Sequence, residues 1–197
     1  MTIRVDAITG SALQAYLGDL ARLRIEVFRD FPYLYDGDLV YEEKYLRAFA
    51  SSRDAIIAGA FDGDRLVGAA TAAPLRGQAS EILAPFVEVQ IELAPYFYFG
   101  ESVLRHDYRG RGIGVRFFEL REAQARSMGA KIATFCSVVR PGGHPQRPAD
   151  YMPLDQFWGH RGYAPVDGRV CEMSWKEIGE TEATPRRMQF WEKRLQP

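Results

Sequence analysis

Two kinds of hydrophobic pattern alternate along the chain. Apolar residues spaced by three and four positions predict helices, whereas alternating or continuous apolar runs predict strands. The first half divides into a strand over residues 2–9, a helix from Gly10 to about Pro32, a helix over 39–50, strands over 55–61 and 65–72, and a helix over 79–93. Asp62-Gly63-Asp64 joins the two strands as a hairpin turn. The last helix is predicted from Ile82, Phe86, Val89 and Leu93, despite Pro85.

The second half is organised around one stretch, residues 96–128. It begins as an aromatic and aliphatic run that suits a strand buried on both faces. It then passes through Arg109-Gly110-Arg111-Gly112-Ile113-Gly114 and continues as an amphipathic helix that ends before Gly129. Beyond it we predict a strand over 131–139, a loop over 140–150, a short helix over 154–160, and strands over 170–175 and 188–195 separated by a polar linker, 177–187.

The turn between that strand and helix has the features of an anion site. Three glycines at alternate positions let the backbone approach a ligand, and the start of the helix presents free N–H groups and a positive dipole end. Four arginines fall within twelve residues here, in a protein whose net charge is only −1: Arg105, Arg109, Arg111 and Arg116. Free amides and guanidinium groups together predict a bound phosphate.

The glycine spacing narrows the choice of phosphate ligand. The dinucleotide fingerprint G-x-G-x-x-G does not fit, because the third glycine comes one residue early, and no Lys-Ser or Lys-Thr follows as in a P-loop. The loop resembles motif A of the GNAT superfamily of N-acetyltransferases, Arg/Gln-x-x-Gly-x-Gly/Ala, at Arg109, Gly112 and Gly114. The preceding residues 103–108 are similar to that family's approach from strand to loop.

This resemblance implies a fold and a coenzyme. The fold is an α/β (α+β) N-acyltransferase domain that spans residues 1–197, with a mixed twisted sheet flanked by helices and splayed at the coenzyme strand. The coenzyme is acetyl-CoA, whose pyrophosphate the loop holds while the end of the strand pairs with the pantetheine arm. The resemblance places coenzyme contacts at Val103, Leu104, Arg109, Gly110, Arg111, Gly112, Ile113, Gly114 and Val115.

Composition excludes several other classes of protein. The 25 basic and 26 acidic side chains leave no overall charge for nucleic-acid binding. No apolar run approaches the ~20 residues of a membrane span, and the N-terminus lacks the apolar core of a signal peptide. Cys136 and Cys171 do not make a disulfide framework, and no His or Cys spacing indicates a metal. We expect a cytoplasmic protein, monomeric or homodimeric, without a metal.

Acetyl transfer to an amine requires a base, and Glu101 is the candidate. Strand alternation places it on the same side as Phe97 and Phe99, although a bulge near Gly100 would change that register. Apolar neighbours favour a carboxylate that accepts a proton near neutral pH. The alternative is a structural carboxylate that pairs with an arginine or reaches solvent. Substitutes for this base are two glutamates predicted to share one helix face, Glu88 and Glu92.

The proton donor to the leaving thiolate is harder to identify. Residues 157–163 resemble the family's Phe-Tyr-x-x-x-Gly-Phe element, in which the tyrosine commonly faces the coenzyme sulfur. Trp158 stands at the tyrosine position, and its indole cannot give up a proton at a useful pH. Tyr151 or His160 are the substitutes, and catalysis by positioning alone is the alternative.

The acceptor is predicted to be an amine of a small molecule, peptide or protein. Candidate contacts are Phe31, Tyr33 and Tyr35, together with Glu88 in the 79–93 helix. Aromatic rings near Asp36 and Asp38 could seat a cationic amine. The alternative is that these rings pack the first helix onto the sheet.

Three other functions compete with N-acetyl transfer. The chain could be a CoA-binding sensor without turnover, which Trp158 favours, or an acyltransferase with a longer donor or a hydroxyl acceptor. A nucleotide-phosphate binder is disfavoured because neither phosphate-loop pattern fits. Glu101→Gln separates an enzyme from a sensor, because an enzyme would lose turnover and keep coenzyme binding.

Overall fold

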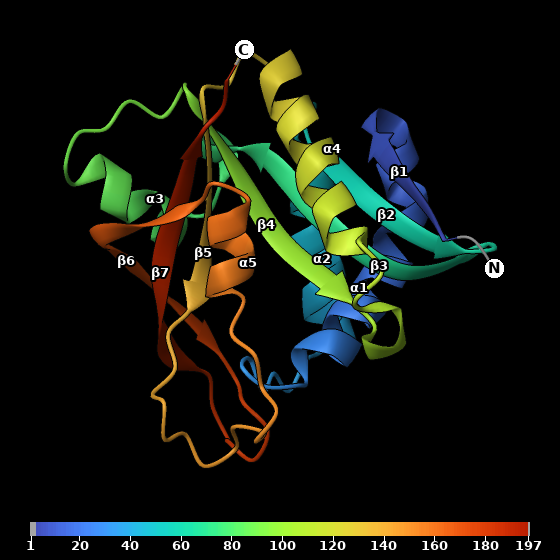
Figure 1. Cartoon of the computed structure of the whole chain (residues 1–197), viewed down its shortest axis with the longest axis vertical. Coiled ribbons are helices and arrows are strands. Elements are labelled where there is room, and N and C mark those ends of the chain that lie inside the picture. Colours follow the sequence, from blue (N-terminus) through green and yellow to red (C-terminus); the bar gives the residue numbers. More distant parts are fainter. Residues whose placement is uncertain (1–2, 197) are drawn as a thin grey trace.

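The computed structural model describes residues 3–196, which form a mixed seven-stranded sheet between layers of helices (Figure 1). In spatial order the strands are β1 (Arg4–Thr9), β2 (Ile56–Asp62), β3 (Arg65–Pro74), β4 (Tyr96–Leu104), β5 (Ile132–Val138), β7 (Thr184–Arg194) and β6 (Ala164–Trp175). Neighbouring strands are antiparallel except for the parallel pair β4–β5. The predicted α/β fold with a mixed sheet is confirmed. The predicted start of the first strand, residue 2, lies outside the described residues.

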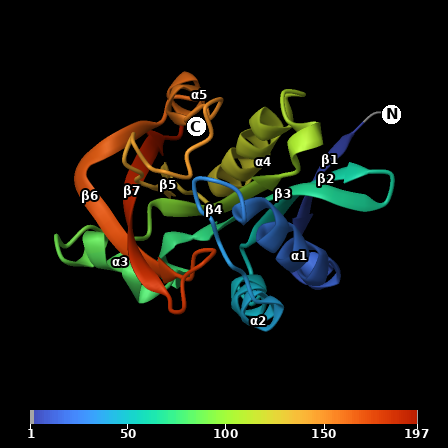
Figure 2. The same ribbon diagram turned by 90° about the horizontal axis from the view of Figure 1, so that it is seen from below.

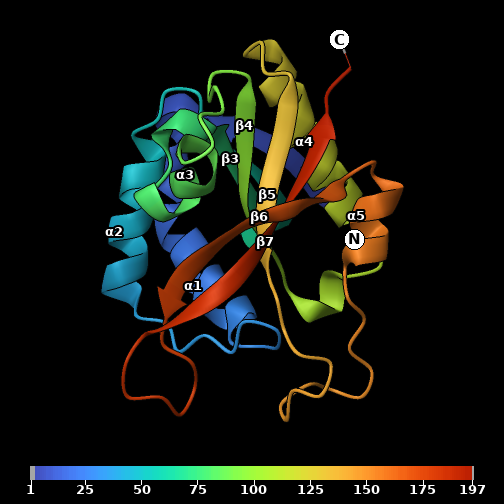
Figure 3. The same ribbon diagram turned by 90° about the vertical axis from the view of Figure 1, so that its left-hand side faces the viewer.

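Helices cover both faces of the sheet (Figures 2 and 3). One face carries α1 (Leu17–Phe28), α2 (Leu39–Ala50) and α3 (Ser80–Val87), and the other carries α4 (Ile113–Ser127) and α5 (Asp155–His160). Short 3-10 turns occur at η1 (Gly10–Tyr16), η2 (Leu75–Gly77) and η3 (His106–Tyr108). Within residues 3–196, no helix combines the length and the apolar character needed to cross a membrane.

Two predicted helices differ from the observed ones. The first begins as the 3-10 turn η1 and ends at Phe28, four residues before Pro32. The third, predicted over 79–93, ends at Val87 because Gln90 adopts a left-handed backbone (φ 57°) and the Ile91 N–H donates to the Phe86 carbonyl. Glu88 and Glu92 therefore do not share a helix face, and both are exposed.

The last two strands are longer than predicted. β6 begins at residue 164 rather than 170, and β7 begins at 184 rather than 188, so part of the predicted linker is strand. The added residues, 164–169 and 184–187, mix Ala, Pro, Val and Gly with polar and charged side chains, and none of them is buried. Backbone pairing holds these ends together without a hydrophobic pattern that sequence reading could detect.

The sheet splays between β4 and β5. Their parallel pairing covers only three positions, from Tyr96 opposite Ile132 to Tyr98 opposite Thr134. β4 then continues to Leu104 beside β3, while β5 continues to Val138 beside β7. The backbone groups that β4 and β5 turn toward each other beyond Tyr98 are thus left for another partner.

A β-bulge in β4 decides where Glu101 points. Ala70 pairs with Ser102 and Ala72 pairs with Phe99, so Thr71 alone stands opposite Gly100 and Glu101. Phe97 and Phe99 pack with Phe118 of α4, whereas Glu101 contacts α1 on the opposite face. The predicted side of Glu101, shared with the two phenylalanines, is wrong because the extra residue reverses the alternation.

Gly100 fits this bulge because it has no side chain. An added Cβ would lie 2.4 Å from Thr71 Oγ1 and 3.7 Å from Thr71 Cβ. We expect Gly100→Ala to lower the free energy of unfolding by about 1–3 kcal/mol through overpacking. Adding Thr71→Ala removes the hydroxyl and should restore much of that loss in urea denaturation. Equal losses in Gly100→Ala with and without Thr71→Ala would show that this contact is not the cause.

Candidate functional site

The glycine loop lies between the end of β4 and the first turn of α4. Gly110 and Gly112 have φ values of 74° and 77°, a backbone region that favours glycine, and Gly112 is the residue that caps α4. A helix start leaves its first N–H groups without helical partners. A neighbouring hollow of about 500 Å³ includes Arg105 and Arg111 in its lining, but it also holds three carboxylates and none of the loop glycines, so it does not itself indicate an anion site. The loop itself has the shape and donors of an anion site.

The four arginines of this region have different partners. Arg105 holds the Glu26 carboxylate through two nitrogens, and Arg116 pairs with Glu119. Arg109 Nε donates to the Leu104 carbonyl at 3.3 Å, and Arg111 Nη2 donates to the Asp107 carbonyl at 2.8 Å. Among the described residues, no carboxylate forms an ion pair with Arg109 or Arg111. Both are exposed, and their charge remains available to an anion.

The other predicted coenzyme contacts differ in how exposed their side chains are. The side chains of Val103 and Ile113 are buried in the core, so their main chains are the parts that can reach a ligand. Leu104, Gly114 and Val115 are partly exposed around the same turn. The predicted set is thus gathered at one end of β4 and the start of α4.

A cavity of about 420 Å³ lies on the α1–α2 face of the sheet. Its walls come from α1, α2, the 29–38 loop and strands β4, β5, β6 and β7. Gly100, Glu101 and Cys136 line it where β4 and β5 separate. The cavity therefore meets the splayed part of the sheet, next to the strand that leads into the glycine loop.

An ion-pair triad occupies one wall of the cavity. Arg24 Nη1 lies 2.6 Å from Glu101 Oε2, and Arg24 Nε pairs with Glu42 Oε2. The Arg24 guanidinium also lies over the rings of Phe28 and Tyr45, at 5.2 and 4.8 Å from their centroids. Burial alone would lower the pKa of Arg24, but the two carboxylates outweigh it and raise that pKa above its ordinary value. Arg24 is therefore a fixed positive charge.

A tyrosine and a cysteine meet beside the splay. The Tyr98 hydroxyl lies 3.2 Å from Cys136 Sγ, and both residues line the cavity. Burial, followed by the neighbouring Cys136, raises the pKa of Tyr98 well above its ordinary value. Tyr98 is therefore protonated near neutral pH and can donate a hydrogen bond.

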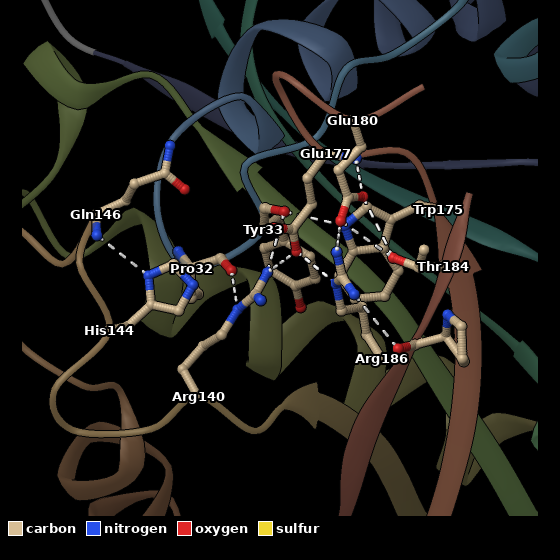
Figure 4. Close-up of polar contacts among 11 residues, drawn as sticks. Pro32, Tyr33, Arg140, His144, Gln146, Trp175, Glu177, Glu180, Thr184 and Arg186 are labelled. Atoms are coloured by element: carbon tan, nitrogen blue, oxygen red, sulfur yellow. Dashed lines mark hydrogen bonds and ion pairs between the residues drawn. The ribbon is translucent and has the colours of Figure 1, made fainter. Parts of the chain in front are cut away.

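The 29–38 loop, which forms a wall of the cavity, is fastened to the outer strands (Figure 4). Arg140 Nε donates to the Pro32 carbonyl at 2.6 Å, and Trp175 Nε1 donates to the Tyr33 carbonyl at 2.9 Å. Glu177 then binds Arg140 and Arg186 together (Figure 4). The Arg140 and Glu177 side chains are about nine-tenths buried. This clamp, formed by residues 32–33, 140, 175, 177 and 186, holds the cavity wall in place.

The structure brings together some of the predicted site residues and separates others. Tyr33, Tyr35 and Glu101 line the cavity. Phe31 does not, since its ring packs edge-on against Tyr151 with centroids 4.6 Å apart, and Tyr151 is also outside the lining. Glu88 is exposed beyond the end of α3.

The aromatic residues of segment 157–163 pack in the core, whereas His160 is exposed. Trp158 packs against Phe135 and Trp191, with ring centroids 5.1 and 5.0 Å away. Tyr163 is buried and donates its hydroxyl to Glu122. Neither Trp158 nor His160 lines the cavity.

Sequence reasoning missed Arg24, Glu42, Tyr98 and Cys136. Arg24 follows the buried Leu20 by four positions, and Glu42 precedes the buried Leu46 by four. Each is a charged residue on the apolar face of a helix, and the two carry opposite signs. That pairing was the available signal, since buried charges require partners.

Comparison with known proteins decides the family. A model of the acetyltransferase (GNAT) family matches residues 20–147, which include the triad and the glycine loop. The chain belongs to this family. No curated protein sequence matches it significantly.

Solved structures share the GNAT fold at low sequence identity. The ribosomal-protein-alanine N-acetyltransferase of Brucella melitensis superposes with a TM-score of 0.62, 14% identity, and coverage of 99% of this chain and 100% of that one. An aminoglycoside 6'-N-acetyltransferase in complex with coenzyme A superposes with a TM-score of 0.58 and 18% identity, and the match covers 100% of this chain and 98% of that one. The Salmonella typhimurium yncA protein, solved with its cofactor acetyl-CoA, superposes with a TM-score of 0.63 and 8% identity, and the match covers 100% of this chain and 95% of that one. These likenesses support the GNAT fold of the chain.

Proposed function

We propose that this GNAT protein transfers an acetyl group from acetyl-CoA to an amine bound in the cavity, by direct attack. The carrying observation is that the cavity opens at the splay between β4 and β5, beside Glu101. A thioester that runs from the glycine loop along β4 would end at this point. Family members solved with acetyl-CoA or coenzyme A support this donor.

The residues divide the work of transfer among them. Arg109, Arg111 and the N–H groups of Gly112 and its neighbours hold the pyrophosphate, with Val103, Leu104, Gly110, Ile113, Gly114 and Val115 as the surrounding contacts. Glu101 takes the proton of the ammonium, which frees the nitrogen lone pair to attack the thioester carbon. The carbon–sulfur bond then breaks, and the second proton, which the nitrogen loses on becoming an amide, passes to the thiolate sulfur.

Tyr98 stabilises the thiolate by donating a hydrogen bond to the sulfur in the mechanism we propose. It lines the cavity at the splay, and burial keeps its hydroxyl protonated. Tyr151, the donor predicted from the sequence, packs on Phe31 outside the cavity lining and would have to move to reach the sulfur. Tyr33 and Tyr35 contact the acceptor, whereas Phe31 and Glu88 could do so only from outside this cavity.

Calorimetric titration with acetyl-CoA tests the coenzyme site, with NAD and ATP as comparison ligands. We expect Gly112→Ala to weaken acetyl-CoA binding at least about ten-fold, or 1.4 kcal/mol, because alanine disfavours the positive φ that aims the loop amides. The matched control is Gly129→Ala, at φ 75° after the other end of α4. Neither added Cβ would contact another group within 4 Å.

The control separates loop geometry from general strain. Both variants should lose similar stability, and only Gly112→Ala should lose coenzyme affinity. Absence of acetyl-CoA binding by the wild type, or equal binding by both variants, would remove the basis for the proposed function.

A further inference from the structure

The triad wall of the cavity carries an unbalanced buried charge. Two carboxylates, Glu42 and Glu101, share one guanidinium, Arg24, which leaves one excess negative charge. The three side chains are 0%, 4% and 12% exposed, respectively. The buried Arg121 guanidinium offsets part of this charge, since it interacts electrostatically with Glu101, whereas Glu42 shares Arg24 alone. A ligand that brings one positive charge to this wall would offset the remaining negative charge.

Two carboxylate oxygens of the triad also lack a hydrogen-bond donor. Glu42 Oε1 and Glu101 Oε1 are both buried and have no hydrogen-bond partner among the described residues. Burial, followed by hydrogen bonding to the Glu42 carboxylate, raises the pKa of Tyr35, so its hydroxyl stays protonated and lies close to Glu42. An ammonium group has three N–H donors and no acceptor. It can satisfy both oxygens once the side chains of this wall shift to admit it, because both oxygens are closed to solvent before a ligand binds.

The remaining walls suit an organic cation. Aromatic rings from α1, the 29–38 loop, α2, β4 and β6 line the cavity, and Arg24 already lies over two of them. The lining holds four carboxylates and two basic side chains. One of these basic groups, Lys176, is bound to Asp36 at 2.7 Å. A carboxylate on the acceptor would therefore meet like charge without a free cation to balance it.

We propose that the cavity selects a compact primary amine that carries no carboxylate, held by its ammonium group at Glu42 and Glu101. This inference rests on the proposed function, because it names the class of acceptor. Glu42 is a specificity-determining residue in this scheme, and Glu101 is both a contact and the base. An α-amino acid is rejected, while the amine with the same side chain and no carboxylate is accepted.

Matched pairs of amines test the inference: tyramine against L-tyrosine, and 1,5-diaminopentane against L-lysine. Two readouts are used, thiol release from acetyl-CoA and calorimetric binding to the protein saturated with coenzyme A. We expect kcat/KM for each amine to exceed that of its amino acid by at least about 100-fold, because like charges at a desolvated site cost several kcal/mol. Glu42→Gln should weaken tyramine binding by about ten-fold and reduce the preference over tyrosine.

The control variant is Glu43→Gln. Glu43 is the next residue of α2, pairs with Arg47 at 3.6 Å with a 39% exposed side chain, and does not line the cavity. It should leave the preference unchanged. Equal use of amine and amino acid, absence of amine binding, or a preference insensitive to Glu42→Gln would each overturn the inference. If acetyl-CoA fails to bind, the proposed function fails. Calorimetric binding of each amine and its amino acid to the free protein then still tests whether the cavity prefers the amine.

Discussion

The Glu101→Gln variant is expected to bind acetyl-CoA as tightly as the wild type while its kcat falls by about 100- to 10,000-fold. The amide has the size of the carboxylate and can still accept a hydrogen bond from Arg24, but it cannot take a proton from the ammonium. Folding should be preserved, because removing one carboxylate from a triad with one excess negative charge leaves a neutral pair. Calorimetry and single-acceptor kinetics measure the two quantities separately.

Glu43→Gln serves again as the control for a carboxylate outside the cavity. A kcat within a few-fold of the wild type in Glu101→Gln would assign Glu101 to the structural alternative, a carboxylate that pairs with an arginine. Wild-type protein that binds acetyl-CoA and turns over no amine would support the sensor function instead.

Replacing Arg24 with methionine should lower the free energy of unfolding by about 3–5 kcal/mol, the range found when one partner of a buried ion pair is removed. The loss arises because Glu42 and Glu101 stay buried without their cation. Urea denaturation measures it. Adding both Glu42→Gln and Glu101→Gln removes the stranded charges and should recover much of the loss.

Arg22→Met is the matched control on the same helix. Arg22 pairs with Asp19 at 2.6 Å, but its side chain is 62% exposed. Surface pairs of this kind contribute at most about 1 kcal/mol. Similar losses in the Arg22 and Arg24 variants, or no recovery in the triple variant, would show that the buried charges are not what Arg24 stabilises.

The features predicted from the sequence are those with a local cause. Helical spacing, the hairpin turn and the glycine loop are set by neighbouring residues, so most elements could be placed, and the loop could be located between β4 and α4. The length of α3 could not, since the apolar residues Val89 and Leu93 continue a helical spacing that the left-handed Gln90 interrupts. The added first residues of β6 and β7 were missed because each segment contains a proline and has no buried residue, which leaves no hydrophobic alternation to detect.

The cavity chemistry depends on contacts between distant segments. The direction of Glu101 follows from one extra residue opposite Thr71. The sequence suggested a bulge near Gly100 only as an alternative, because nothing local shows that the bulge forms. Arg24, Glu42 and Glu101 come from three elements, and only the fold places them together. The aromatic residues 31–35 pointed to an acceptor region, but nothing local indicates that Phe31 turns toward Tyr151 while Tyr33 and Tyr35 line the cavity.

The clamp on the 29–38 loop has a consequence for how the protein is made. Trp175 and the Tyr33 carbonyl are 142 residues apart in sequence, and Glu177 and Arg186 emerge from the ribosome later still. Contacts of such long separation form late, because much of the chain must be ordered first. A nascent chain that has released α4 already contains the whole glycine loop but lacks the outer wall of the cavity. The cavity is thus completed only when synthesis reaches the final strands, after the glycine loop has left the ribosome.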